Sequence, residues 1–296
     1  MNIFADNARK SAIVMVKGMR AENAQFTESY WIRYVARAME PTGNIHFHSD
    51  LEFYYPVSGV KACLLDDRVV DIQARDMIII YPNQIHKFVR NDEEIYERHV
   101  VVTKMGFLDE IQENNELLSV LHQAQRAGIN RITLSEANHW ELMEMLTEYY
   151  YIEGTASATR RKLLCAQVVV FICDLLKGQM QEKEELVYNK SVEPILDYIN
   201  LHYREVECNL DSIAAGCSLS KHYLCDLFKR STAMTINNYL QSRRILCAKE
   251  LLAEGYNVTE TAEMAGFSDD GNFIRVFKKY IGITPKQYQI MRRDAK

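Results

Sequence analysis

Three histidines and one glutamate in the first third of the chain could ligate a metal or hydrogen-bond a small molecule. His46, His48 and Glu52 have equal parity, so an unbroken strand would point all three to one face. His86 follows Pro82 at the start of another short apolar run and could complete the set. Imidazoles and a carboxylate suit Zn, Ni, Mn or Fe. The cluster therefore predicts a divalent metal site or the polar groups of a ligand pocket, with histidines satisfied by their neighbours as the plain alternative.

Aromatic and basic residues with matching parity accompany this cluster. Tyr54 has the parity of Glu52, and Trp31, Arg33 and Arg37 share one face of an earlier strand. An aromatic plane can stack on the C–H face of a sugar, while Arg or Glu fixes hydroxyls or carboxylates. Plain packing inside a sheet is the alternative for the aromatics. The candidate effector-binding residues are His46, His48, Glu52, Tyr54, His86, Trp31, Arg33 and Arg37.

Short strands are expected to position these side chains. Residues 30–38 alternate between two faces with a period of two. Further apolar and aromatic runs follow at 51–57, 60–65, 68–72, 77–81, 85–89 and 96–102, with turns at 58–59 and 66–67. Closely spaced short strands of this kind predict a small barrel or sandwich.

The pattern becomes helical from about residue 105. One amphipathic segment runs to Tyr150 behind the caps Ser135 and Asn138, and a more apolar one covers 159–180. The apolar run 165–176 is too short to span a bilayer. The polar segment 179–189 is typical of an interdomain linker.

Charge is divided unevenly along the chain. The 296 residues carry a formal net charge of −5, but residues 190–296 hold 15 Lys/Arg and 13 Asp/Glu, which leaves −7 on the remainder. This distribution fits an acidic N-terminal domain that repels phosphates and a mildly basic C-terminal domain that can bind them. The seven cysteines show no CxxC spacing, which is typical of reduced thiols and favours the cytoplasm. The polar N-terminus does not predict a signal peptide.

The last hundred residues carry one helix-turn-helix pattern twice. The copies cover about 210–230 and 259–279, with Leu224 corresponding to Phe273 and Phe228 to Phe277. Such a unit lays its second helix in the DNA major groove. The helical segment 236–252 between the copies would span roughly 25 Å, which could hold two reading helices about one DNA turn, ~34 Å, apart. A bundle with merely solvated charges is the alternative, and two copies in register disfavour it.

Outward residues at the start of each second helix are the candidates for DNA contact. Arg275 could fork onto a guanine edge, and Asn272 could pair with adenine or hold a phosphate. Asp226 would repel phosphate but could accept from a cytosine amine. The candidate DNA-binding residues are Lys221, His222, Cys225, Asp226, Lys229, Arg230, Gly271, Asn272, Arg275, Lys278 and Lys279.

Residues 210–293 resemble the DNA-binding domain of AraC/XylS-type transcription regulators. SLSKHYLCDLFKR at 218–230, YLQSRRILCAKELL at 239–252 and AEMAGFSDDGNFIRVFKKYIGITPKQY at 262–288 carry the resemblance. It implies that His222, Asp226, Gly271 and Arg275 face bases. Asp226 stands where members often have a basic or polar group, Gly271 offers no side chain to read with, and Gln289 stands where an Arg is common.

The pattern HFHSDLE at 46–52 resembles the first motif of the cupin barrel, and 82–86 loosely resembles the second. Many AraC-type regulators carry a cupin-like effector domain ahead of the DNA-reading domain. The resemblance implies an α+β fold of two domains. Residues 1–182 would form a cupin-like β-barrel with trailing helices for effector binding and dimerisation, 183–191 a linker, and 192–296 an all-α domain with two helix-turn-helix units.

We therefore expect a cytoplasmic DNA-binding transcription regulator, an activator, that answers a small-molecule effector such as a sugar or sugar derivative. It would bind double-stranded DNA, contact RNA polymerase as an activator, and have no role at a membrane. Segment 159–180 would form a homodimer contact, unless it packs in the core. No cofactor is required and no catalytic residue is assigned, although a divalent metal could itself be the effector. The rival class is a metal-dependent cupin isomerase or dioxygenase using His46, His48, Glu52 and His86, which leaves residues 190–296 unexplained.

Overall fold

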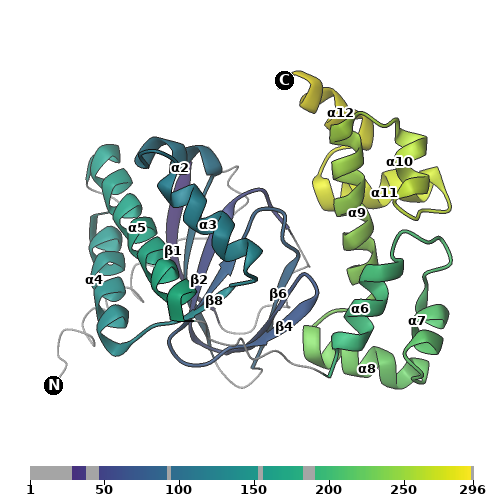
Figure 1. The fold of residues 1–296 in the computed structure, drawn as a ribbon, viewed down its shortest axis with the longest axis horizontal. Coiled ribbons are helices and arrows are strands. Elements are labelled where there is room, and N and C mark those ends of the chain that lie inside the picture. Colours follow the sequence, from purple (N-terminus) through teal and green to yellow (C-terminus); the bar gives the residue numbers. More distant parts are fainter. Residues whose placement is uncertain (1–28, 38–46, 92–94, 153–155, 183–190, 295–296) are drawn as a thin grey trace.

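The computed structural model describes residues 29–37, 47–91, 95–152, 156–182 and 191–294. Two antiparallel sheets with flanking helices are followed by an entirely helical region (Figure 1). The two-domain α+β fold expected from the sequence is confirmed. His46 lies outside the described residues, and of Arg37 only the backbone is described.

The strands form a five-stranded and a three-stranded sheet. The larger sheet has the order β1-β7-β2-β5-β8 and the smaller one β4-β3-β6. The strands are β1 (Tyr30–Arg37), β2 (Leu51–Ser58), β3 (Val60–Leu65), β4 (Arg68–Asp71), β5 (Asp76–Ile80), β6 (His86–Arg90), β7 (Tyr96–Thr103) and β8 (Arg131–Thr133). The seven runs expected between 28 and 102 are thus strands within one or two residues, whereas β8 was not anticipated.

The larger sheet buries both of its faces. Side chains alternate along each strand, so Phe53 and Ile79 face the neighbouring helices while Tyr54 and Ile78 face the smaller sheet. The facing interior is formed by Tyr54, Cys63, Leu65, Val70, Ile78, Ile80, Val100 and Val102, with Trp31, Phe88 and Tyr96 packed against them. The two sheets therefore enclose an apolar interior between them, which we call the barrel interior.

Four helices described after β7, with β8 between the second and the third of them, cover the outer face of the larger sheet (Figure 1). They are α2 (Met105–Ile111), α3 (Glu116–Arg126), α4 (Glu136–Ile152) and α5 (Ala158–Glu182). Helix α5 packs on α3, α4 and the sheet, and Val168, Ile172 and Leu176 have no exposed area. Core packing explains why this helix is so apolar.

Helix α5 is also long and apolar enough to cross a membrane by length and composition alone. The stretch Ala158–Met180 has a mean hydropathy of 1.6, with 39% of its window buried. This stretch is longer than the run 165–176 counted from the sequence, because Ala158–Leu164 and the residues after Leu176 extend it. A helix with one face in a protein core satisfies the same criterion, and α5 has such a face.

Seven helices are described after residue 191. They are α6 (Glu193–His202), α7 (Leu210–Gly216), α8 (Lys221–Thr232), α9 (Ile236–Glu254), α10 (Val258–Met264), α11 (Asp270–Ile281) and α12 (Pro285–Asp294). Helix α9 has 19 residues and is therefore about 28 Å long. It stands between the α7–α8 unit and the α10–α11 unit (Figure 1).

The first helix-turn-helix unit shares its core with the smaller sheet. Ala62, Leu64 and Val69 turn away from the barrel interior and join one apolar cluster with Leu196 and Phe228 of the helical region. Helix α8 contacts β3 and β6, and α6 contacts β4. The second unit instead packs with the C-terminal half of α9 in a cluster that contains Ile245, Phe273 and Phe277. The barrel and the first unit thus form one continuous packed body.

Candidate DNA-reading and effector sites

The two helix-turn-helix units are built with the same local devices. Asn209 caps α7 and Asn257 caps α10, each in a reciprocal capping box with the residue three positions on. The second helices also match, because Ser220 caps α8 by accepting from Tyr223 N and Asp269 caps α11 by accepting from Asn272 N. Each second helix has 12 residues. The repeat seen in the sequence is therefore a structural repeat.

Helix α8 presents its predicted reading residues to solvent. Leu224 and Phe228 have no exposed area and hold the helix on its unit. The other face is exposed at Lys221, His222, Cys225, Asp226, Lys229 and Arg230. Two of these residues are tied to each other, because Arg230 Nη2 lies 2.8 Å from Asp226 Oδ2. Lys221 forms an ion pair with Asp211 of α7.

Arg230 also lies on the side of α8 that turns toward the barrel. It lines a hollow of about 250 Å³ with Lys61, Ala62, Asp71 and Val89 of the smaller sheet. Its pairing with Asp226 neutralises the carboxylate that would otherwise repel a phosphate. Arg230 is thus placed to orient Asp226, and Lys221 and Lys229 project from the rest of the outer face.

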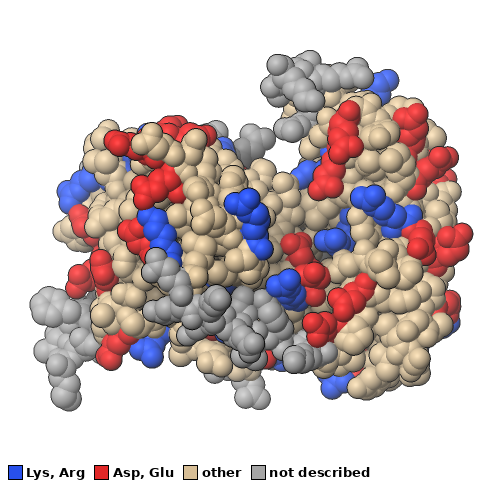
Figure 2. Space-filling model, in the orientation of Figure 1, with Lys and Arg blue, Asp and Glu red and all other residues tan. Residues whose placement is uncertain are grey.

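Helix α11 presents the corresponding face of the second unit. Phe273, Val276 and Phe277 are buried, and the exposed residues include Gly271, Arg275, Lys278 and Lys279. Asn272 is partly buried, and its Oδ1 accepts a 2.8 Å hydrogen bond from Arg275 Nη2. This bond holds the guanidinium beside the first turn of the helix. Figure 2 shows Lys and Arg scattered among Asp and Glu over the visible face rather than gathered in one basic field.

Three of the four predicted metal-type residues come together in the barrel. His48 Nε2 lies 3.0 Å from Glu52 Oε2, and the His48 and His86 rings are 5.0 Å apart. One ligand atom from each of His48, Glu52 and His86 lies within 4.8 Å of the others. Burial lowers the pKa of His48, but hydrogen bonding and the charge of Glu52 outweigh it and leave that pKa raised. The donor set fits a transition metal or a polar ligand.

The predicted aromatic and basic candidates lie beside this cluster. Tyr54 is buried and stacks on Phe88 at 3.6 Å between ring centroids, and Phe88 lies 6.4 Å from the His86 ring. Trp31 packs against the barrel interior, with the Arg33 guanidinium 5.2 Å from its ring. Tyr54 is therefore an interior residue, and Trp31 packs against the same interior.

Strand β7 contributes interior residues that sequence reasoning did not select. Tyr96 Oη accepts a 2.6 Å hydrogen bond from Tyr54, and Arg98 stacks over Tyr96 at 4.3 Å. Both have the parity of Val100 and Val102, which face the interior. The sequence signal that could have identified Arg98 is a charged residue at a position whose strand neighbours two and four residues on, Val100 and Val102, are apolar.

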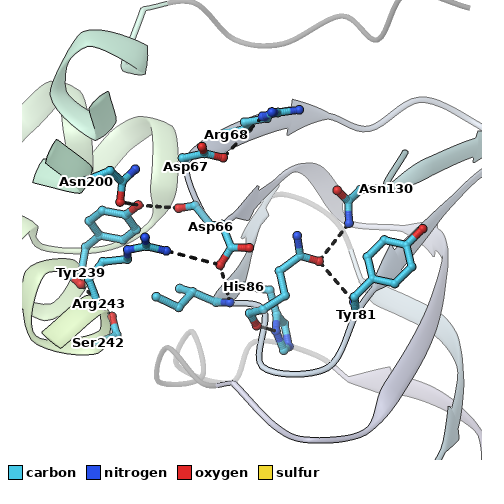
Figure 3. A network of polar contacts seen from close by, with 12 residues as sticks. Asp66, Asp67, Arg68, Tyr81, His86, Asn130, Asn200, Tyr239, Ser242 and Arg243 are labelled. Carbon is cyan, nitrogen blue, oxygen red and sulfur yellow. Dashed lines mark hydrogen bonds and ion pairs between the residues drawn. The ribbon is translucent and has the colours of Figure 1, made fainter. Parts of the chain in front are cut away.

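A polar junction joins the barrel to α9 (Figure 3). Tyr239 has no exposed area, and its hydroxyl donates to the carbonyl oxygen of Asp66 at 2.6 Å. Asn200 Oδ1 lies 3.1 Å from the same hydroxyl, while Asn200 Nδ2 is buried without a partner. One hydroxyl hydrogen cannot serve two acceptors, so turning the Asn200 amide by 180° lets Nδ2 donate to Tyr239 and satisfies both groups.

The same junction is tied to the segments that carry the two histidines. Asp66 exchanges main-chain and side-chain hydrogen bonds with Ile85, the residue before His86. Asn83 N donates to His48 O at 2.6 Å, and Asn83 Oδ1 accepts from Lys249 of α9 at 2.8 Å. Lys249 also lies 5.0 Å from the ring of Phe47. The neighbours of both histidines therefore contact α9.

A polar cleft of about 300 Å³ lies at this junction. Asp66, Asn83, Gln84, Arg243 and Glu250 are among the residues that line it. Arg243 Nη1 is 3.9 Å from Asp66 Oδ1, which is a long ion pair (Figure 3). Burial raises the pKa of the Asp66 carboxyl, with hydrogen bonds and Arg243 acting against that effect. The junction therefore combines apolar packing with a partly open polar seam.

Comparison with known proteins assigns both parts of the chain. Residues 31–147 match the AraC-like ligand-binding domain, and residues 213–291 match a helix-turn-helix domain. An uncharacterized HTH-type transcriptional regulator of Pseudoalteromonas carrageenovora is 38% identical over 103 residues, or 35% of this chain and 61% of that protein. The chain spans between 16% and 61% of the length of three such curated relatives.

Two solved structures are similar to the chain in part or in whole. The C-terminal domain of the response regulator yesN from Fusobacterium nucleatum has 35% identity, covering 34% of this chain and 99% of that one, with a TM-score of 0.33. ToxT from Vibrio cholerae, solved with an unsaturated fatty acid bound, has 14% identity, covering 92% and 98%, with a TM-score of 0.36.

An AraC-like ligand-binding domain ahead of tandem helix-turn-helix units is the domain composition of a DNA-binding regulator. The chain belongs to the AraC-type family of transcription regulators. The family resemblance drawn from residues 210–293 is confirmed, whereas the cupin motifs at 46–52 and 82–86 stay a prediction.

Proposed function

We propose that the chain reads an operator by placing α8 and α11 in two neighbouring stretches of the major groove. The observation that carries this proposal is the matched pair of capped 12-residue helices, joined by α9, with exposed polar faces. Helices of this kind enter the groove with their N-terminal residues against base edges. His222, Asp226, Asn272 and Arg275 would read bases, and the lysines would hold phosphates.

The barrel is the sensor in this proposal. A small molecule at His48, Glu52 and His86 would change the position of the segments that hold the histidines. Asn83 and Ile85 lie in the second of these segments and contact Lys249 and Asp66. A ligand that prefers one arrangement of these contacts shifts the population of barrel–α9 arrangements by its difference in affinity. The effector would thus control how α8 and α11 are presented.

We further propose that the protein works in the cytoplasm as a homodimer, and as an activator contacts RNA polymerase. The outer stripe of α5 carries the exposed Leu163 and Val170, which would pair with a second copy. Two chains would place four reading helices on repeated half-sites. Analytical ultracentrifugation of Leu163→Glu against the wild-type chain tests the contact, and an unchanged dimer would reject it.

The test of DNA reading uses the full chain, because the first unit shares its core with the barrel. Duplexes selected from a random pool are titrated at several salt concentrations. The proposal requires an enriched sequence and an affinity that falls as salt rises. Arg275→Ala should relax the sequence preference by about 1–3 kcal/mol at one position, while Arg126→Ala on α3 should not. Binding that shows no preference in the wild-type chain would overturn the proposal.

A second candidate is a regulator whose effector is a divalent metal. The convergence of His48, Glu52 and His86 within 4.8 Å favours it, since two imidazoles and a carboxylate are an ordinary transition-metal donor set. Equilibrium dialysis with Zn²⁺, Ni²⁺ and Mn²⁺ is compared for wild type, His86→Ala and the exposed-histidine control His122→Ala. One equivalent retained only when His86 is present, together with altered DNA affinity, supports a metal effector.

The enzyme alternative makes a different prediction in the same samples. A metal-dependent cupin enzyme would hold one metal and turn over a substrate while ignoring all DNA. We infer that the cluster has no catalytic role, because a chain that acted only as an enzyme would leave the helix-turn-helix region unexplained. Sequence-specific DNA binding by a chain that also turns over a substrate would reject this inference.

A further inference from the structure

Arg98 lies in the wall of the barrel on the interior face of β7. It pairs in register with Val35 of β1 and Pro56 of β2, and has the parity of the buried Val100 and Val102. Its guanidinium carbon lies 4.3 Å from the Tyr96 ring centroid and 5.8 Å from that of Tyr54. The residue as a whole is only partly buried, so part of it reaches solvent although Nη1 does not.

The charge of Arg98 is not matched by an acid. Its Nη1 atom is buried and has no hydrogen-bond partner, and among the described residues no carboxylate forms an ion pair with it. Arg131, across the larger sheet, shows the usual arrangement, since its Nη1 donates to Asp71 O and lies 3.9 Å from Asp76. A buried donor on a charged group without an acceptor is costly. The π faces of Tyr54 and Tyr96 offset only part of that cost.

Tyr96 adds a second donor to the same group. Tyr54 donates its hydroxyl hydrogen to Tyr96 Oη, so the Tyr96 hydrogen is left to donate elsewhere. Burial raises the pKa of both phenols, which therefore stay protonated as donors at neutral pH. The guanidinium and the Tyr96 hydroxyl together form a donor pair beside an aromatic stack.

We propose that the effector of this barrel is a small organic anion, and that its carboxylate or phosphate group binds to Arg98 and the Tyr96 hydroxyl. An Arg fork suits either group because it offers parallel donors to two oxygens. The remainder of the molecule would extend along the Tyr54–Phe88 stack toward His86. Glu52 at that end disfavours a second negative group.

This inference rests on the proposed function, because it names the class of molecule that the sensor binds. Charge-matched probes isolate the anionic group: glucuronate and gluconate against glucose for a carboxylate, and glucose 6-phosphate and inorganic phosphate for a phosphate. Binding to the full wild-type chain is measured by calorimetry and by thermal shift. Each acid that binds should do so at least about tenfold more tightly than glucose, because a charge-assisted hydrogen bond contributes that much or more.

The variants are Arg98→Gln, Arg98→Lys and the exposed control Arg126→Gln. Arg98→Gln should weaken the anion by about tenfold or more, Arg98→Lys less, and Arg126→Gln not at all. The Arg98→Lys variant keeps the test valid if Arg98→Gln fails to fold. Equal binding of acids and glucose, unchanged anion affinity in Arg98→Gln, or no anionic probe bound by the wild-type chain would each overturn the inference.

Operator binding in the same preparations distinguishes failure of the anionic-effector proposal from failure of the proposed regulator function. If the chain binds DNA sequence-specifically but no anion binds in an Arg98-dependent way, the regulator function stands and the anionic effector is rejected. Loss of all DNA selectivity in the wild-type chain rejects the proposed function instead, whatever Arg98 binds.

Discussion

The Tyr239 hydroxyl of α9 donates a 2.6 Å hydrogen bond to the carbonyl oxygen of Asp66, 173 residues earlier in the chain. Tyr239 has no exposed area, and it packs on Phe228 at 5.7 Å between ring centroids. One side chain therefore belongs to the α9 spacer, to the core of the first helix-turn-helix unit and to the barrel hairpin. Any motion of the hairpin that carries Asp66 must be accommodated at Tyr239.

Replacing Tyr239 with Phe should destabilise the protein by about 1–3 kcal/mol. The ring still fits, but the carbonyl of Asp66 and the amide of Asn200 lose a buried partner. Urea unfolding followed by fluorescence measures the loss. Tyr151→Phe is the matched control, since Tyr151 is 79% exposed and its change should stay within about 0.5 kcal/mol. Equal midpoints for the two variants would show that the hydroxyl contributes nothing.

Gly266 should tolerate no side chain, because two separate constraints meet there. Its φ is +84°, and an added Cβ would lie 2.6 Å from Tyr203 O and 2.8 Å from Arg204 O. Gly255, the αL cap of α9, has φ +108° but nothing within 4 Å of the same atom. Gly255→Ala should therefore cost about 1–2 kcal/mol for the backbone alone, and Gly266→Ala clearly more. Comparable melting temperatures for the two variants would contradict the close approach.

Local pattern predicted most elements because local chemistry determines them. The expected runs became strands within one or two residues, and the side chains of Ser220 and Asp269 cap α8 and α11. Parity grouped Tyr54 with Glu52 and Trp31 with Arg33, and the structure shows that Tyr54 and Trp31 contact the barrel interior. Strand β8 could not be predicted, because three residues contain too little alternation to be distinguished from a loop.

Contacts between distant segments could not be predicted in this way. Ala62, Leu64 and Val69 form the outward parity of ordinary hairpin strands, and nothing near them in sequence indicates that α6 and α8 cover them. The convergence of His48, Glu52 and His86 was predictable as a set, but its connection to α9 through Asn83 was not. Only the tertiary arrangement shows that the barrel and the first helix-turn-helix unit share a core.

His99 should make the protein less stable as pH falls below neutral. Burial, with a smaller contribution from His139, lowers the pKa of His99 from 6.5 to about 4. Between these values the unfolded chain binds a proton that the folded protein does not. This stabilisation is therefore complete above about pH 6.5 and is lost as pH falls toward 4, to an extent of up to about 3 kcal/mol.

Four titratable side chains surround the His99 ring. Tyr150 of α4 lies 2.9 Å from Nδ1, and Tyr34, Tyr55 and His139 lie nearby. Urea unfolding at pH 5 and pH 7 is compared for wild type, His99→Gln and the exposed control His122→Gln. The difference between the two pH values should shrink in His99→Gln alone. An undiminished difference would assign the pH dependence to other groups.

Lys278 should contribute to DNA affinity through phosphate contact, and so through salt dependence. It is exposed in the last turn of α11, on the same helix as Arg275, which is proposed to read a base. Removing one phosphate contact reduces the slope of log affinity against log salt by about 0.9 and weakens all sequences nearly equally. Lys278→Ala should show both effects in anisotropy titrations of the selected duplex. Lys177→Ala, which removes an ion pair with Glu116 on the far helices, should leave the slope unchanged. A Lys278→Ala variant with the wild-type slope would mean that α11 does not approach the phosphate backbone in this orientation.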